Sequence, residues 1–217
     1  MRDNPKATVI NVVLGVVLLG GLFVFTVVVP DLGDDPEPAA GTPSESASAP
    51  AQGPIDLPDK LSSGLVAVDL GNLPDQLAQQ FGDLEALKKQ EGSIADGLEQ
   101  VFGVPGAFRV YAAEDGSAIA QMTALDKAPG LFTPDALPID PEVLGVARAA
   151  SELVEVEGAT CSLNWGEEVP AGQAIDPAQD PQAIRCQLGA GERTYELTAQ
   201  GLPLVDAVGV LKDLAGQ

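Results

Sequence analysis

The chain has 217 residues, contains no histidine, and carries a formal net charge of −21 from 32 acidic and 11 basic residues. Without histidine, Ser-His-Asp and Cys-His nucleophilic sites and histidine metal sites are excluded. The acidity argues against nucleic acid as a partner, since binding to phosphates depends on Lys and Arg. These exclusions favour a protein without enzyme activity and without a bound cofactor.

Residues 8–29, from Thr8 to Val29, carry no charge. As a helix they would reach roughly 33 Å, enough to cross the hydrocarbon core of a bilayer. Arg2 and Lys6 precede this segment and acidic residues follow it, which keeps residues 1–7 in the cytoplasm as a short tail. A cleaved signal peptide would have a shorter apolar region that ends in small residues. We therefore predict a single-pass protein of the cell membrane whose C-terminal part is extracytoplasmic.

One face of this predicted transmembrane helix could contact a second helix. Ala7, Asn11 and Gly15 fall at positions i, i+4 and i+8. Small residues allow two helix backbones to approach closely, and an Asn side chain can form a hydrogen bond across the interface. Asn11 also lies near the cytoplasmic end, where water can satisfy it, and the segment has no GxxxG motif. Helix–helix contact and simple anchoring both remain open.

Residues 30–58 are predicted to form a disordered linker. They contain seven prolines and six acidic residues, with no Lys or Arg. Such a composition buries little apolar surface and stays extended. Residues 59–217 are then of the right length for one extracytoplasmic domain.

The first part of this domain is predicted to be helical. Asn72 can act as an N-cap, and Gly82 is expected to break or bend the segment. Ser93, followed by Asp96 at the spacing of a loose capping box, predicts the start of a second helix that ends at Gly103. A hairpin is predicted next, because Glu114-Asp115-Gly116 is a good turn between two strand-like runs. These runs are Ala107–Ala112 and Ser117–Ala124.

The second part is predicted to consist mainly of strands. After a proline-rich loop, Asp140 can cap a short helix. Strands are then predicted at Glu152–Val156, Ala159–Trp165, Ala183–Leu188 and Arg193–Ala199, followed by a helix from about Pro203 to Ala215. This order predicts an α+β fold in which an antiparallel β-sheet of five to six strands is packed by helices on one face.

The two cysteines, Cys161 and Cys186, predict one disulfide, because the environment outside the membrane can be oxidising. Residue parity supports the pairing: it places two apolar stripes on the same side of the sheet. These stripes are Cys161-Leu163-Trp165 and Ile184-Cys186-Leu188. A closed loop of this length stabilises a fold by roughly 3 kcal/mol in the chain-entropy model.

Two loops carry candidate binding residues. Leu131 and Phe132 stand between turn-forming residues, where they could form an exposed contact for a partner or could tuck against the edge of the sheet. The loop 166–181 carries Glu167, Glu168, Asp176 and Asp180. It could bind calcium, but it lacks the order of a known calcium loop and is equally well explained as an acidic surface loop.

Single residues give weaker signals. Trp165 could be a stacking platform, although its parity with Cys161 favours the core. The scattered arginines, Arg109, Arg148, Arg185 and Arg193, are expected to form surface ion pairs rather than an anion site.

Our leading hypothesis is a non-enzymatic, membrane-anchored interaction module, or an accessory subunit of an envelope complex, with another envelope or membrane protein as its partner. A domain that senses or binds a small ligand or a cation, with a pocket between sheet and helices, is the second hypothesis. A carboxylate-dependent hydrolase of envelope polymers is the third, because that chemistry can proceed without histidine.

Overall fold

A computed structural model of the chain describes residues 55–71, 78 and 81–216. The chain divides into two units, residues 1–47 and 48–217, and all described residues belong to the second. The predicted transmembrane segment 8–29, with Ala7, Asn11 and Gly15, lies outside the described residues, as does most of the predicted linker. No helix in the described part of the chain is both long enough and apolar enough to cross a membrane.

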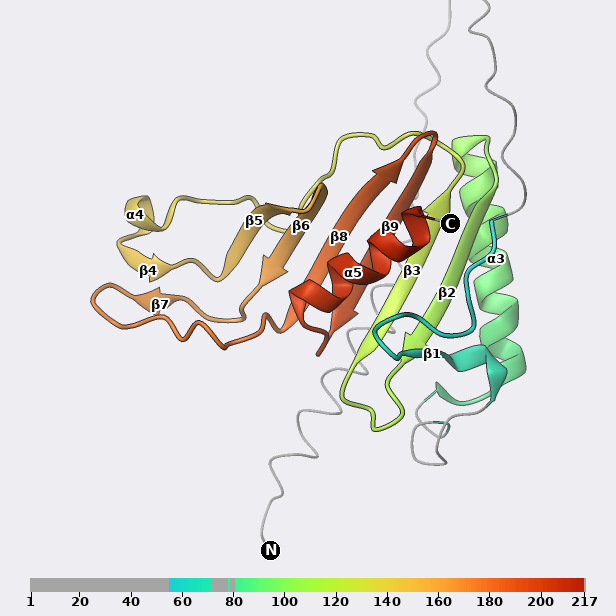
Figure 1. The fold of residues 1–217 in the computed structure, drawn as a ribbon, viewed down its shortest axis with the longest axis horizontal. Coiled ribbons are helices and arrows are strands. Elements are labelled where there is room, and N and C mark those ends of the chain that lie inside the picture. Colours follow the sequence, from blue (N-terminus) through green and yellow to red (C-terminus); the bar gives the residue numbers. More distant parts are fainter. Residues whose placement is uncertain (1–54, 72–77, 79–80, 217) are drawn as a thin grey trace, which may run out of the picture. The chain divides into compact units, whose positions relative to one another are not determined.

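A seven-stranded antiparallel sheet forms the centre of the domain (Figure 1), which confirms the predicted α+β class. The strand order is β1-β2-β3-β9-β8-β6-β5. The strands are β1 (Val66–Ala67), β2 (Gly106–Ala112), β3 (Ile119–Leu125), β5 (Ser151–Val156), β6 (Ala159–Asn164), β8 (Ala183–Ala190) and β9 (Arg193–Gln200). We expected five to six strands; β1 is too short to leave a pattern in the sequence. Two further short strands, β4 (Val146–Arg148) and β7 (Val169–Pro170), pair only with each other.

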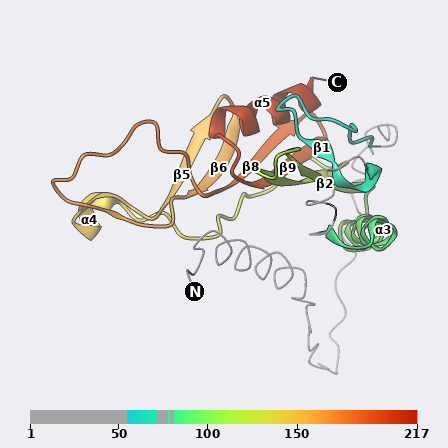
Figure 2. The same cartoon turned by 90° about the horizontal axis from the view of Figure 1, so that it is seen from below.

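The helices pack on both faces of the sheet, so the prediction that they share one face was wrong (Figure 2). Helix α5 (Leu204–Ala215) covers β8 and β9 on one face, and α3 (Leu84–Phe102) packs against β2 on the other. The cause lies in β2, where Tyr111 belongs to the core under α5 while Val110 and Ala112 pack toward α3. Because this strand is apolar on both sides, each of its faces needs a cover.

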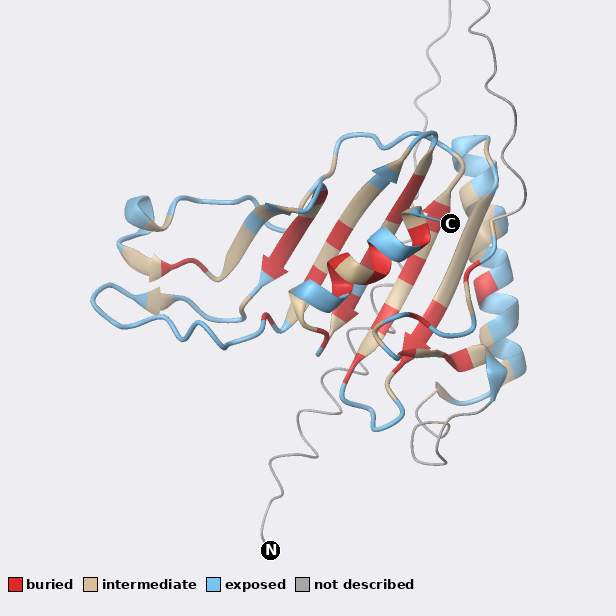
Figure 3. Cartoon of the chain, viewed as in Figure 1, coloured by how far each residue is buried: buried red, intermediate tan, exposed pale blue. Residues whose placement is uncertain are grey.

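The main core lies between the sheet, α5 and the extended segment 57–65, and a smaller cluster lies under α3 (Figure 3). The largest fully buried side chains are Tyr111, Met122, Leu197, Leu211, Val68, Val210 and the two cysteines. Cys161 and Cys186 stand directly opposite each other on β6 and β8 and form a disulfide. Both the predicted bridge and the predicted buried face are therefore confirmed.

Helix α3 is continuous, so Ser93 does not start a second helix as predicted. The helix begins after Asp83, whose carboxylate accepts a hydrogen bond from the Glu85 N–H, and it ends at Gly103. Gly82 has a φ of +71° and lies directly before Asp83, the N-cap of α3. Once Asp83 caps the start, Ser93 is an ordinary position on an exposed helix surface. Two shorter elements, η1 (Val68–Leu70) and α4 (Pro141–Leu144), complete the fold.

Candidate functional site

An arm extends from the sheet past β5, as Figure 1 shows. We define the arm as residues 135–150 and 165–182, which contain α4, β4 and β7. Its two halves come from different connections, one leading to β5 and the other joining β6 to β8. The short β4–β7 ladder holds the halves together, with a register shift between Val146 and Arg148. The arm is therefore formed by two connections that strand pairing holds together, and not by a single loop.

Buried side chains fix the base of the arm. Arg148 is only 5% exposed, and its guanidinium carbon lies 4.0 Å from the centre of the Trp165 ring. Arg148 also donates a hydrogen bond to the side-chain oxygen of Gln179, and the Trp165 indole N–H donates to Glu152. The expectation that Arg148 forms a surface ion pair was wrong, because Arg148 is buried and stacks on an aromatic ring. Its Nε is buried without a hydrogen-bond partner among the described residues.

Large apolar side chains are exposed along the outer part of the arm and just before it. Leu131 is 94% exposed, and the exposed side chains that follow it are Leu137, Ile139, Val143 and Leu144, with Ile175 on the other half of the arm. None of these belongs to either core cluster. Residues 131–144 therefore concentrate apolar surface in contact with water.

Acidic side chains lie on the same segments as these apolar residues, and we call them the acidic rim. The exposed carboxylates of the arm are Asp135, Asp140, Glu142, Glu167, Glu168, Asp176 and Asp180. The only Lys or Arg within the arm is the buried Arg148. The predicted calcium loop is part of this acidic rim. No group of three or more Asp, Glu, Cys or His side chains in the described part of the chain could hold a metal ion.

A strap, which we define as residues 126–134, leads from β3 to the arm along the sheet. Thr194 donates a hydrogen bond to the carbonyl oxygen of Lys127 at 2.7 Å. Pro129 lies against Gly189, where a Cβ would come within 2.4 Å of the proline ring. These contacts hold the strap on β8 and β9. The role of Gly189 in admitting Pro129 is not visible in the sequence.

Leu131 and Phe132, predicted together as a partner contact, have different environments on the strap. The Phe132 ring lies 5.5 Å from the guanidinium carbon of Arg185, and Leu131 points into solvent. Arg185 also donates to Glu196 at 2.8 Å and to Asp135 at 3.2 Å. These two carboxylates raise the pKa of Arg185 above its ordinary value against the opposing effect of burial, with the Glu196 hydrogen bond as the largest cause. Phe132 thus helps to hold the strap, and the contact of either residue with a partner stays a prediction.

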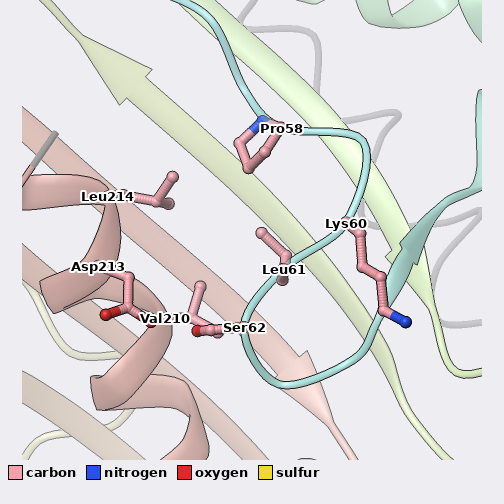
Figure 4. Close-up of a pocket in the computed structure, with 7 residues that line it drawn as sticks. All are labelled: Pro58, Lys60, Leu61, Ser62, Val210, Asp213 and Leu214. Carbon is pink, nitrogen blue, oxygen red and sulfur yellow. The ribbon is translucent and has the colours of Figure 1, made fainter.

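A cavity beside α5 gives little support to a ligand-binding site. It has a volume of about 400 Å³ and lies between the segment 58–62 and α5, not between sheet and helices as the ligand-binding hypothesis expected (Figure 4). Leu61, Val210 and Leu214 form its apolar walls. The side chains of Lys60 and Asp213 point in opposite directions (Figure 4). Specific recognition of a small molecule uses polar groups that converge on it, and this cavity does not bring Lys60 and Asp213 together.

Comparison with known proteins does not place the chain in a family. No family model, no curated protein and no solved structure matches it. The arm is therefore the main guide to function.

Proposed function

We propose that this protein is a membrane-anchored, extracytoplasmic interaction module that binds another envelope protein through its arm and has no enzyme activity of its own. The observation that carries the proposal is the exposed apolar surface of residues 131–144. Burying apolar surface yields about 25 cal/mol per Å². Exposed apolar groups with a polar rim are typical of protein–protein contacts.

The charge of the arm specifies the partner further. Exposed carboxylates lie on the same segments of the arm as the apolar side chains, and Arg148, the one Lys or Arg of the arm, is buried. Opposite charges across an interface speed association and select the partner. The arm therefore suits a protein surface with apolar groups at its centre and Lys or Arg at its rim. An anionic lipid surface is disfavoured, because these carboxylates repel acidic headgroups.

The predicted anchor at residues 8–29 and the predicted linker would bring such a partner from the same membrane within reach.

Site-specific photo-crosslinking in intact membranes tests the proposal. A photoreactive amino acid replaces Leu137 or Val143 in the full-length protein, and matched controls carry it at Val101 or Val205. All four side chains are large, apolar and more than 70% exposed, but Val101 and Val205 lie on α3 and α5.

We expect one discrete protein adduct from the two arm positions and none from the controls. Leu137→Ser together with Val143→Ser should abolish adduct formation from a probe at Leu144. The proposal is refuted if the arm positions give no adduct, or if the controls give the same adduct in the same yield.

A further inference from the structure

Strand β2 has an unpaired edge along most of its length. In the described part of the chain, its outer neighbour β1 pairs only with Tyr111 and Ala112. The other side of β2 pairs with β3 over all seven residues. No strand formed by the described residues therefore lies beside residues 106–110 on the outer side. Such an edge presents backbone N–H and C=O groups to any extended chain that can approach it.

The direction of these backbone groups follows from one hydrogen bond. The Val110 N–H donates to the Glu91 carboxylate at 2.8 Å and so points away from β3. In an antiparallel sheet, alternate residues direct both backbone groups to the same neighbour. Phe108 and Gly106 therefore also direct theirs to the open side. The bond from the Asp126 N–H to the Pro105 carbonyl oxygen agrees, since it assigns the odd residues to β3.

Glu91 occupies the place that a neighbouring strand would take. Its carboxylate oxygen accepts a backbone N–H of β2, as the carbonyl of a paired strand would, and the side chain is only 8% exposed. Only Val110 is satisfied in this way. A groove of about 350 Å³ continues along the strand from there, between α3 and the segment 56–57. Its floor is Gly106 to Arg109, which at about 3.4 Å per residue accepts three to four residues of an extended chain.

The α3 wall of the groove contains a glycine that packing does not require. A Cβ on Gly92 would meet no atom within 4 Å. Glycine inside a helix costs about 1 kcal/mol relative to alanine. Gly92 therefore lowers the stability of helix α3. Because it has no side chain, it leaves more space in the groove where it borders it.

The charged residues that line the groove indicate which charge its ligand carries. Asp56, Asp69 and Glu91 line it, together with Lys88 and Arg109. Arg109 is already engaged: it donates to Asp69 at 3.0 Å and to the Leu57 carbonyl oxygen at 2.7 Å, and it pairs with Asp59 at 2.8 Å. Arg109 and Asp69 offset each other, which leaves the carboxylates of Asp56 and Glu91 against the single cation of Lys88 and favours a basic ligand.

We infer that the edge of β2 is a second binding surface, which takes an extended polypeptide segment carrying Lys or Arg as an added strand beside residues 106–109. Main-chain hydrogen bonds to Phe108 would supply the affinity, and the carboxylates of the groove would supply the preference for basic side chains. This surface shares no residue with the arm, so it can bind whether or not the arm does.

Hydrogen exchange of the full-length protein in nanodiscs tests this inference. The probes are the capped hexapeptides Ac-Lys-Val-Lys-Val-Lys-Val-NH₂ and Ac-Glu-Val-Glu-Val-Glu-Val-NH₂. The variants are Gly92→Ala and, as the matched control, Gly97→Ala, which lies on the same helix and also has open space where its Cβ would stand.

We expect the basic peptide to slow exchange of the Gly106 and Phe108 N–H groups, and the acidic peptide to leave it unchanged. Both alanine variants should melt at a higher temperature than the parent, because alanine favours the helix. Gly92→Ala alone should weaken binding of the basic peptide, by about tenfold.

Three outcomes would overturn the inference: no protection of the Gly106 and Phe108 N–H groups, equal protection by the two peptides, or equal binding by the two variants. Protection that appears without peptide and rises with protein concentration would also overturn it, since a second copy of the chain would then be the occupant. Loss of the arm contacts through Leu137→Ser and Val143→Ser should leave this binding unchanged.

Discussion

Removal of the disulfide tests whether the closed loop between β6 and β8 reduces the conformational entropy of the unfolded chain. The bridge joins Cys161 to Cys186 across a sequence separation of 25 and encloses the second half of the arm. In the chain-entropy model, closing a loop of this size lowers the entropy of the unfolded chain enough to stabilise the fold by about 3 kcal/mol. For a domain of this length, the loss corresponds to a fall in Tm of roughly 10 °C.

The double variant Cys161→Ala and Cys186→Ala should therefore unfold at a lower denaturant concentration than the parent. Its m-value should be larger, because an unfolded chain without the bridge exposes more surface. The single tryptophan, Trp165, lies at the base of the arm and reports the transition by fluorescence. Dithiothreitol should shift the parent to the stability of the variant and leave the variant itself unchanged. A difference in unfolding free energy below about 0.5 kcal/mol would refute the reasoning, because it would mean that the bridge constrains nothing.

Two further substitutions test the packing at single residues. Gly201→Ala should destabilise the fold by about 3 kcal/mol or more, because φ is +70° and the new Cβ would lie 2.1 Å from the Ser117 carbonyl oxygen. Gly145→Ala, with φ of +68° and no neighbour within 4 Å, should cost only about 1–2 kcal/mol in the same denaturation assay. Burial raises the pKa of Glu91 above its ordinary value of 4.5, with Asp69 adding to the effect and the Val110 N–H, Arg109 and Lys88 opposing it. Ionisation of Glu91 therefore disfavours the fold once pH rises above that value, so the stability of Glu91→Gln relative to the parent should increase between pH 4 and pH 7; a constant difference would contradict this assignment.

The strand region and its bridge could be predicted because local patterns determine both. Alternation along residues 159–165 and 183–188 fixes which side chains face the core, and only one register puts Cys161 opposite Cys186. The tight turn at Glu114-Asp115-Gly116 likewise specifies the β2–β3 hairpin without help from distant residues. In these places the local preference and the tertiary fold agree.

The placement of the helices and the chemistry of the arm could not be predicted, because both depend on contacts between distant residues. The pattern of β2 alone does not say which helix covers Val110 and which element covers Tyr111. Arg148 reads as a surface cation until β4 and β7 pair and bring it over Trp165. Glu91 reads as an exposed helix residue until the sheet edge supplies the Val110 N–H that it binds.

The order of the strands also sets the distance between the two proposed contacts. Strand β2 carries one proposed contact, and β5, the sixth strand when counted from β2, borders the arm. Five spacings of about 4.8 Å separate these two strands by roughly 24 Å. Two polypeptides could therefore occupy the domain together without touching each other. A protein of this kind would act as a bridge: it would raise the effective concentration of one partner around the other even if each single contact were weak.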